Sequence, residues 1–370
     1  MKILVLGGTG AMGKNLVEIL ANEGHCLTVT SRCQHQSLDP NVSYVKGNAH
    51  DITFLKFVLA GNSWDAIIDF MVYSTPEFLA RNELLLSATA QYIFLSSSRV
   101  YADNPILNEE SNRILDTTSD AEYLKTDEYA LTKARQENIL IKSKFKNWTI
   151  IRPYITFSDE RLQLGVFEKE DWLYRAIHGR KIVFPKNMAN CYTTMTLGSD
   201  VAKVIFAVVG NASAYQKVLQ ITSDQTILWK DILDLYTKTI SKFYNREPKI
   251  KWIEDMGFLC LVMQNKYQVN VDRMYNRKFK SNKIHEFCGQ DFAFSKIDEE
   301  LPACLERFLS HPRFRTIDWG TQAYMDRLSG EFTPCREIPS FSQKVKYLLF
   351  RFSPIKVSLF LRNVIRDLRN

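Results

Sequence analysis

A short apolar segment followed at once by a glycine-rich loop stands at the start of the chain. Residues 3–6 read Ile-Leu-Val-Leu, and residues 7–13 read Gly-Gly-Thr-Gly-Ala-Met-Gly. The apolar run predicts a buried strand, and residues 11–22 predict a helix with four aliphatic side chains on one side. A glycine-rich turn between a strand and a helix is typical of the first unit of a nucleotide-binding βαβ fold.

The three glycines of this loop that are spaced by three residues have separate expected roles. We expect Gly7 to permit a tight turn, Gly10 to let the backbone approach a pyrophosphate, and Gly13 to let the helix pack close to the strand. The start of the helix offers free N–H groups and a partial positive charge to phosphates. A plain turn is the alternative, but the βαβ pattern that follows favours dinucleotide binding. The predicted cofactor contacts of the loop are Gly7, Thr9, Gly10, Ala11, Met12 and Gly13.

Apolar runs and helical patterns continue to alternate along the first 150 residues. Strands are predicted at 26–30, 42–45, 66–70, 92–95 and 148–151, and helices at 52–59, 78–88 and 121–144. These strands lack the alternation of apolar and polar residues that a half-exposed strand shows, and this is typical of a parallel sheet covered on both faces. The predicted fold is therefore α/β: a Rossmann-type doubly wound parallel sheet with a smaller mixed substrate-binding C-terminal domain and a basic helical tail.

The expected domain limits follow from where this regularity ends. Residues 1–165 are expected to form the dinucleotide-binding domain, with returning segments near 190–222. Residues 166–340 are expected to form the substrate-binding region, and residues 341–370 the tail. Beyond residue 165 the pattern predicts helices at 166–178, 200–209 and 229–243 and a strand at 218–221.

Charge is concentrated in the tail. The chain has 48 basic and 41 acidic residues and a net charge of +7. Residues 341–370 contain seven basic residues and one acid, which leaves 7 − 6 = +1 for the first 340 residues. A nearly neutral body argues against a protein that binds nucleic acid over its whole surface.

The end of the tail has the pattern of an amphipathic helix. Ser353 and Pro354 are expected to begin it. One side would carry Val357, Phe360, Leu361, Val364, Ile365 and Leu368, and the other Ser358, Arg362, Arg366 and Arg369. A basic amphipathic helix can lie on an anionic membrane surface. The alternative is that its apolar side packs on the body of the protein.

Cysteine and histidine usage points to a reduced, metal-free protein. The seven cysteines form no CxxC pair, and the six histidines show no HxxxH or HxH spacing, so we expect free thiols and no metal site. The apolar run at the N-terminus is too short for a signal peptide, and no uncharged apolar stretch reaches about 18 residues. We expect a cytoplasmic protein, with peripheral membrane association left open.

The end of the second predicted strand bears on the choice between NAD and NADP. The strand ends in Thr30-Ser31-Arg32 and carries no acid that would bind ribose hydroxyls. Arg32, helped by Ser31, is the candidate clamp for a 2′-phosphate, which favours NADP over NAD. An ordinary exposed loop arginine is the alternative.

Candidate catalytic groups follow the fifth strand. Three serines occupy residues 96–98, and Tyr129 and Lys133 lie four residues apart in a helical pattern. Residues at i and i+4 share a helix face, and a nearby cation favours the phenolate form of a tyrosine. A phenol, an ammonium and a serine hydroxyl could together move a proton to or from a carbinol. A solvated Tyr and Lys would be the common explanation if the pattern stood alone.

With these pieces in place, the sequence resembles the extended short-chain dehydrogenases/reductases, a family of NAD(P)-dependent nucleotide-sugar epimerases, dehydratases and reductases. The similarity covers about residues 1–250 and rests on residues 9–13, 95–101, 129–133, 151–153 and the Asp-Val-Ala of 200–202. The resemblance implies Tyr129 as acid/base, Lys133 on the nicotinamide ribose and Ser97 as the hydroxyl partner. It also places Asn48 where the family has an aspartate that contacts adenine.

Departures from the family pattern refine the expected reaction. The 4,6-dehydratases carry Asp-Glu directly after the catalytic Ser/Thr, whereas this chain has Ser98-Arg99, so dehydration is disfavoured. The arginine that often binds the substrate diphosphate aligns near Thr193. The resemblance therefore implies an NAD(P)-dependent epimerase or ketoreductase of carbohydrate biosynthesis. Its expected partner is an activated, nucleotide-linked sugar, and a homodimer is left open.

One branch of the family shares further details with this chain. Residues 64–70 and 147–153 and the missing diphosphate arginine are similar to the chloroplast stem-loop-binding proteins and their bacterial relatives. Members of that branch can lose catalytic residues and bind RNA. The alternative function is therefore that of a Rossmann-fold RNA-binding protein with little or no catalysis. Retention of Tyr129 and Lys133 favours a catalytic function instead and makes nucleic acid an unlikely partner.

Overall fold

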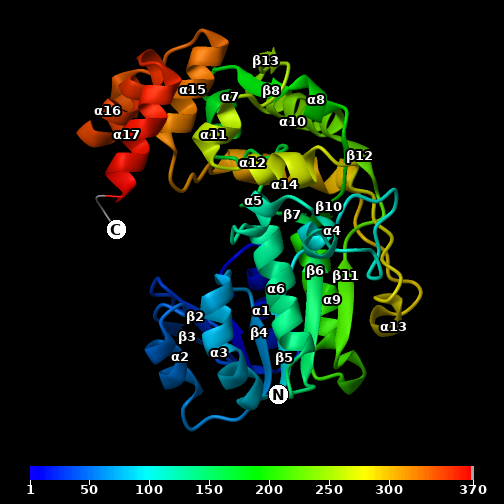
Figure 1. The fold of residues 1–370 in the computed structure, drawn as a ribbon. Helices are drawn as coiled ribbons and strands as arrows, with labels where there is room; N and C mark the ends of the chain where they lie inside the picture. Colours follow the sequence, from blue (N-terminus) through cyan, green and yellow to red (C-terminus); the bar gives the residue numbers. More distant parts are fainter. Residues whose placement is uncertain (368–370) are drawn as a thin grey trace. The chain divides into compact units, whose positions relative to one another are not determined.

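The chain divides into two compact units, each built from several segments. The computed structural model describes residues 1–367, with side chains described as far as residue 363 (Figure 1). The first unit contains residues 1–158, 194–226 and 278–300, and the second contains residues 159–193, 227–277 and the described residues from 301 onward. Residues 278–300, which the sequence assigned to the substrate region, thus belong to the unit that starts at the N-terminus.

A seven-stranded sheet forms the centre of the first unit. Its strand order is β11-β6-β5-β4-β1-β2-β3, and every pairing is parallel. The sheet is doubly wound, as predicted. Strands β1, β2 and β3 follow one another toward one edge of the sheet, and β4, β5, β6 and β11 follow one another toward the other edge. The strands are β1 (Lys2–Leu6), β2 (Cys26–Ser31), β3 (Val42–Lys46), β4 (Trp64–Asp69), β5 (Thr89–Leu95), β6 (Trp148–Pro153) and β11 (Lys217–Ile221).

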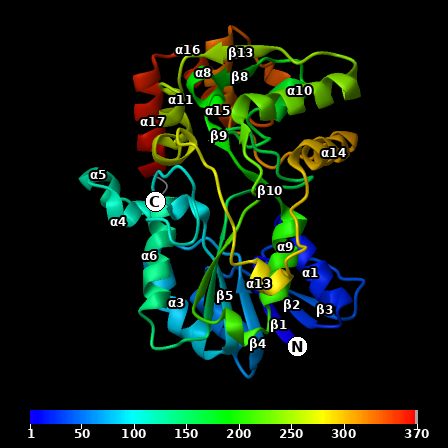
Figure 2. The ribbon, with the colours of Figure 1, turned by 90° about the vertical axis from the view of Figure 1, so that its right-hand side faces the viewer.

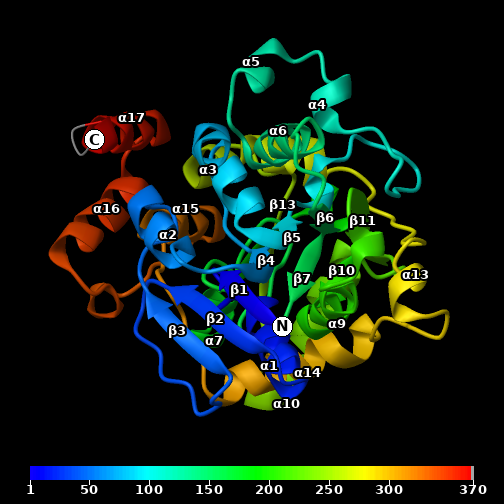
Figure 3. The ribbon, with the colours of Figure 1, turned by 90° about the horizontal axis from the view of Figure 1, so that it is seen from below.

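Helices cover both faces of this sheet, which explains its continuous apolar runs. One face packs against α1 (Gly13–Asn22) and α9 (Gly198–Val208), and the other against α2 (Ile52–Leu59), α3 (Thr75–Ser87) and α6 (Tyr129–Ile141) (Figure 3). Alternate strand residues serve the two cores: Ile3 and Val5 face α1, while Leu4 and Leu6 face α2 and α3. The smaller elements are η1 (Ser98–Val100), α4 (Ile114–Thr117), α13 (His285–Cys288) and the parallel pair β7 (Ile155–Phe157) and β10 (Met195–Leu197).

The predicted long helix over residues 121–144 is wrong in one respect that matters for the site. The structure has α5 (Ala121–Leu124), then a break, and then α6, which begins at Tyr129. Glu128 caps α6 by accepting a hydrogen bond from the Ala130 N–H at 2.8 Å. Asp127 accepts from both the N–H and the hydroxyl of Thr75 at 2.8 and 2.6 Å. These side-chain contacts outweigh the helical pattern and place Tyr129 at the first helical position.

The second unit is mostly helical. Its strands form two small sheets, β8 (Ile182–Pro185) with β13 (Ile250–Ile253) in parallel, and β9 (Tyr192–Thr193) with β12 (Ile227–Leu228) in antiparallel orientation. The predicted helix at 166–178 is reduced to α7 (Leu173–Ile177). Further helices of this unit are α8 (Lys186–Ala189), α10 (Trp229–Tyr244), α11 (Leu259–Met263), α12 (Lys266–Gln268), η3 (Val269–Arg273), α15 (Trp319–Ser329), η4 (Cys335–Glu337), α16 (Phe341–Phe352) and α17 (Ile355–Asp367). α14 (Ile297–Ser310) begins in the first unit and ends in the second.

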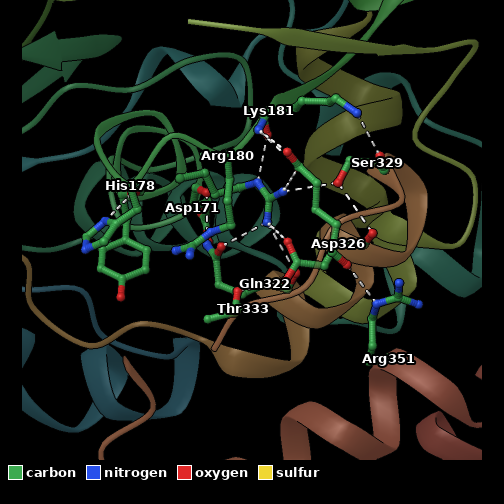
Figure 4. Close-up of polar contacts among 12 residues, drawn as sticks. Asp171, His178, Arg180, Lys181, Gln322, Asp326, Ser329, Thr333 and Arg351 are labelled. Atoms are coloured by element: carbon green, nitrogen blue, oxygen red, sulfur yellow. Dashed lines mark hydrogen bonds and ion pairs between the residues drawn. The ribbon is translucent and has the colours of Figure 1, made fainter. Parts of the chain in front are cut away.

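A buried polar network holds α15 in the second unit (Figure 4). Arg175 of α7 is fully buried and pairs with Asp326 of α15 at 2.6 Å. The second Asp326 oxygen accepts hydrogen bonds from the hydroxyls of Thr333 and Tyr347 at 2.7 and 2.6 Å. The buried charge of Asp326 would be costly without these partners. Since Tyr347 belongs to α16 (Phe341–Phe352), the network determines which side of this helix packs against the rest of the unit.

The tail contains two helices, and the second begins where the sequence predicted. α16 ends at Phe352 and α17 begins at Ile355, so Ser353 closes one helix and Pro354 precedes the next. Residues 368–370, including Leu368 and Arg369 of the predicted amphipathic pattern, lie outside the described residues. Within residues 1–367, no helix combines the length and apolar character that crossing a membrane requires.

Candidate active site

The glycine loop joins β1 to α1 as predicted. Gly7 has a φ of +71°, a conformation that favours glycine. A Cβ on Gly13 would lie 2.6 Å from the Gly8 carbonyl oxygen, so the helix start needs glycine there. A Cβ on Gly10 would meet no described atom within 4 Å, which leaves open space beside the backbone at this point. The loop between Gly7 and Gly13 thus combines a tight turn, a close helix and an open backbone position.

A further glycine supports the loop from α9. A Cβ on Gly198, the first residue of α9, would lie 2.9 Å from the Ala11 carbonyl oxygen. The Asn15 side-chain amide donates to the same oxygen at 3.0 Å, and the Gly7 N–H donates to the Thr30 hydroxyl at 3.1 Å. Thr9, Ala11 and Met12 therefore lie in a loop whose shape is set by three secondary-structure elements. Gly198 was not among the predicted site residues, because its role depends on packing between distant segments.

The residues expected to bind the adenosine end lie just beyond the ends of β2 and β3. Ser31 and Lys46 are paired in the register of these two strands, so Arg32 and Asn48 follow neighbouring strand ends. The Ser31 hydroxyl accepts from the Cys33 N–H at 3.2 Å and bonds the His35 ring at 3.0 Å. Arg32 and Asn48 are exposed. The structure thus brings all three to the same edge of the sheet, where Arg32 reaches solvent.

Lys133 is buried between two strand ends. Its ammonium donates to the carbonyl oxygens of Leu95, at the end of β5, and Met71, beyond the end of β4, at 2.7 and 3.3 Å. Burial lowers the pKa of Lys133 to about 8, partly offset by the nearby carboxyl of Asp69. Burial also raises the pKa of Asp69, which accepts hydrogen bonds from the Met71 N–H and the Tyr92 hydroxyl. The lysine is therefore held in one place by backbone acceptors.

Two cations lie near the ring of Tyr129. Lys133 Nζ is 6.0 Å from the centre of the Tyr129 ring, and the Arg99 guanidinium is 5.2 Å from it. Arg99 also forms an ion pair with Glu128 at 2.6 Å, and both side chains are largely buried. The Tyr123 hydroxyl donates to the other Glu128 oxygen at 2.9 Å. The start of α6 is thus a cluster of charges around one phenol.

Ser97 lies at the start of η1, which packs against α6. Its side chain is buried, and its oxygen accepts from the Arg99 N–H at 3.2 Å. The neighbouring serines have structural partners: Ser96 donates to Glu137 at 2.6 Å, and Ser98 donates to the Arg152 carbonyl oxygen at 2.8 Å. Of the three serines, Ser97 is the one whose hydroxyl is bonded only locally in the described contacts.

A buried ion pair between Glu137 of α6 and Arg152 of β6 supports this arrangement. Glu137 of α6 is fully buried and accepts two bonds from Arg152 of β6, at 2.8 and 2.7 Å, besides the bond from Ser96. Arg113 adds a contact at 3.3 Å. The two bonds from Arg152 tie α6 to β6, and the bond from Ser96 ties it to the end of β5, so together they fix the helix on which Tyr129 and Lys133 lie.

Two charged residues beside Tyr129 were not among the predicted site residues. Arg99 was noted only as a departure from the dehydratase pattern, and Glu128 was not singled out. The substitution of a cation for a family acid next to the catalytic serine was the available signal for Arg99. The pairing with Glu128 depends on the break in the helix, which the sequence pattern did not predict.

Metal and disulfide chemistry find no support in the described part of the chain. All seven cysteines are free thiols. No group of three or more His, Cys, Asp or Glu side chains among the described residues could hold a metal ion. The polar groups that converge at the strand ends are instead a phenol, an ammonium, a guanidinium and hydroxyls.

The parallel sheet, its glycine loop and the Tyr-Lys pair on α6 define a Rossmann-type protein of the extended short-chain dehydrogenase/reductase class. A family model described as the NAD dependent epimerase/dehydratase family matches residues 3–214. The chain therefore belongs to the NAD-dependent epimerase/dehydratase family.

Among curated proteins, the chain is similar to the chloroplast stem-loop binding protein of 41 kDa b of Arabidopsis thaliana. The two are 26% identical over 241 residues, which cover 61% of this chain and 60% of the relative. The chain thus matches less than two thirds of that relative's length. This similarity agrees with the branch expected from the sequence.

Solved structures of the family have the same fold. A UDP-glucuronic acid 4-epimerase from Bacillus cereus matches with a TM-score of 0.61 and 14% identity, over 84% of this chain and 100% of that chain. A dTDP-glucose 4,6-dehydratase from Bacillus anthracis matches with a TM-score of 0.62 and 16% identity, over 84% of this chain and 97% of that chain. At such identities the likeness shows the fold alone.

Proposed function

We propose that this protein is an NAD(P)-dependent epimerase or ketoreductase that acts on an activated, nucleotide-linked sugar. The observation that carries the proposal is that Lys133 and Arg99 both lie near the Tyr129 ring, in the unit that carries the glycine loop. The two solved relatives named above are described as complexes with NAD, and one is a UDP-sugar epimerase. The proposed setting is cytoplasmic carbohydrate biosynthesis.

The residues present fit a dinucleotide. The open space beside Gly10 suits a pyrophosphate, and the start of α1 directs N–H groups toward it. Lys133 is placed to bind the nicotinamide ribose, and Asn48 to bind the adenine. Ser31 and Arg32 would hold the adenosine ribose, and the exposed Arg32 guanidinium supports NADP over NAD.

The proposed proton chemistry is carried by the protein's own groups. A bound nicotinamide supplies the hydride acceptor and donor. The phenolate of Tyr129 takes the proton of the sugar hydroxyl as the carbinol becomes a carbonyl, and returns a proton to that oxygen in the reverse step. The Ser97 hydroxyl donates to the same oxygen. Lys133, whose pKa is about 8, carries a positive charge in most molecules at neutral pH and favours the phenolate.

Epimerisation and reduction use these groups in the same way. They differ in whether the oxidised sugar is reduced again on the enzyme or released. Dehydration needs a further acid and base at the position after the catalytic serine, and here the chain carries Ser98 and Arg99. Ser98 is bonded to the Arg152 carbonyl oxygen and Arg99 to Glu128, which supports exclusion of a 4,6-dehydratase.

The test compares turnover of UDP-glucuronic acid and dTDP-glucose, with NAD⁺ or NADP⁺, by the protein and by Tyr129→Phe. Loss of the general base should lower kcat by about 10²- to 10⁴-fold with cofactor affinity retained. Tyr244→Phe, which removes an exposed phenol from α10, is the matched control. An unchanged rate in Tyr129→Phe would contradict the assignment. Arg32→Ala should lose affinity for NADP⁺ more than for NAD⁺.

RNA binding is the second candidate function, and it is favoured by the similarity to the stem-loop binding protein. Its test is affinity for a stem-loop RNA, which should fall steeply with salt if phosphate contacts dominate. Turnover of a sugar nucleotide without RNA affinity would exclude it. A homodimer is also proposed and is tested by sedimentation.

A further inference from the structure

The outer side of α16 is apolar. Phe341, Val345, Leu348 and Phe352 follow one another at intervals of four, three and four residues, so they share one face of the helix. All four are exposed, Phe341 at 81% and Phe352 at 62% of their surface. The ring of Phe332, itself exposed, lies 6.2 Å from that of Phe352 and extends the stripe.

The inner side of α16 is fixed by buried contacts. Tyr347 and Phe350 are buried, and the Tyr347 hydroxyl bonds both Asp326 and the Thr333 N–H, the latter at 2.7 Å. Asp326, which is labelled in Figure 4, is in turn paired with Arg175. Rotating α16 to hide its apolar stripe would break these buried bonds, so the stripe stays outside.

α17 presents its polar side to the protein, the reverse of the alternative expected from the sequence. Ser358 is buried and donates to the Leu349 carbonyl oxygen at 3.1 Å. Arg362 donates to the carbonyl oxygens of Val262 and Leu261 at 2.5 and 3.1 Å, where α17 lies beside α11 (Figure 2). Val357 and Phe360 are exposed instead, Phe360 at 65%.

The charge of these two helices has one sign. Residues 341–363 contain five basic residues and no acid: Lys344, Lys346, Arg351, Lys356 and Arg362. Lys346 is paired with Asp318, while Lys356 is exposed beside Val357. Exposed apolar side chains interspersed with lysines supply the two signals, burial and attraction to anions, that peripheral membrane binding requires.

We propose that α16 and α17 form a docking surface for an anionic lipid bilayer. We call this the tail surface: Phe341, Val345, Leu348, Phe352, Val357 and Phe360 with Lys344 and Lys356. The apolar residues would enter the boundary between headgroups and acyl chains, and the lysines would meet anionic headgroups. A second copy of the chain is a poorer occupant, because a two-fold interface would place two acid-free basic surfaces opposite each other.

The experiment measures binding of the full chain to vesicles by co-sedimentation. Vesicles of phosphatidylcholine with phosphatidylglycerol are compared with vesicles of phosphatidylcholine alone. One variant combines Phe341→Ser and Phe352→Ser, and a second combines Lys344→Gln and Lys356→Gln. Phe57→Ser, which removes an exposed phenylalanine of α2, is the matched control. All these side chains are at least partly exposed, so circular dichroism should show folded variants.

The protein should bind the anionic vesicles, and less at high salt. The variant without Lys344 and Lys356 should bind about tenfold or more weakly, since each lysine near an anionic surface contributes about 1 kcal/mol, or fivefold. The variant without Phe341 and Phe352 should also bind about tenfold or more weakly, because it loses apolar surface that would be buried in the bilayer. Phe57→Ser should bind as the parent does. Absence of binding, or equal binding of parent and both double variants, would overturn the proposal. Self-association that depends on Phe341 and Phe352 without vesicle binding would assign the surface to a second copy. No substrate is used, so this result is independent of the proposed catalysis.

Discussion

The charge of Arg99 should set the protonation of Tyr129, and substitution by Gln tests this. A unit charge about 5 Å away contributes about 3 kcal/mol at an effective dielectric constant of about 20, or about two pKa units. Arg99 lies 5.2 Å from the Tyr129 ring, but its ion pair with Glu128 offsets part of this effect. We therefore expect Arg99→Gln to raise the phenol's pKa, by less than a bare charge would.

The assay follows the near-ultraviolet absorbance of tyrosinate during a pH titration, with the signal of Tyr129→Phe subtracted, so it needs no substrate. Charged groups near the phenol include Arg99, Lys133 and Glu128, with Asp127 next in the chain and Asp69 beside Lys133. Lys133 titrates near pH 8, so each midpoint belongs to the coupled pair of phenol and ammonium. The same change should move the acidic limb of kcat/KM to higher pH.

Two further variants give the sign of the effect. Arg99→Lys keeps the cation and should leave the midpoint close to that of the parent. Glu128→Gln removes the opposing charge and should lower the midpoint. If parent and Arg99→Gln titrate within about 0.3 units of each other, against the two units available to a bare charge, the guanidinium has only a structural role.

Three other predictions concern the loop, the supporting ion pair and the buried lysine. Gly13→Ala would put a Cβ 2.6 Å from the Gly8 oxygen, so we expect a loss of about 1–3 kcal/mol in stability and weaker cofactor binding by calorimetry; unchanged affinity would contradict the loop's role. Glu137→Gln leaves Arg152 buried without its carboxylate, and urea unfolding should show a loss of about 3–5 kcal/mol; a loss below 1 kcal/mol would refute the argument. The pKa of Lys133 is lowered from 10.5 to about 8, so the unfolded chain binds more protons between these values. The free energy of unfolding should therefore gain up to about 3 kcal/mol as pH rises through this range, relative to Lys133→Met; equal pH dependence in the two proteins would refute it.

The central sheet was predictable because its strands are buried on both faces. A continuous apolar run such as residues 3–6 is suited to a strand that is buried on both faces. The alternation of such runs with helical patterns indicates that the strands are joined by helices in βαβ units. The glycine loop and the Tyr129/Lys133 spacing could likewise be predicted, since both depend on local geometry.

The remaining features depend on contacts between distant residues. The break before α6 depends on Asp127 reaching Thr75, and on Glu128 pairing with Arg99. The orientation of α17 depends on Arg362 finding carbonyl oxygens of α11, a hundred residues earlier. Periodicity describes which residues share a face of a helix, but it does not say which face meets the protein.

The two carbonyl acceptors of Lys133 have a consequence for how this fold can change. The ammonium spans the ends of β4 and β5, since it bonds the Leu95 and Met71 oxygens at the same time. Inserting one residue into either strand would displace one oxygen by about 3.3 Å and detach the lysine. Insertions in the solvent-exposed connections between strands carry no such cost. The alignment of these two neighbouring strands therefore determines where the ammonium is held, and a change in the length of either strand should move it.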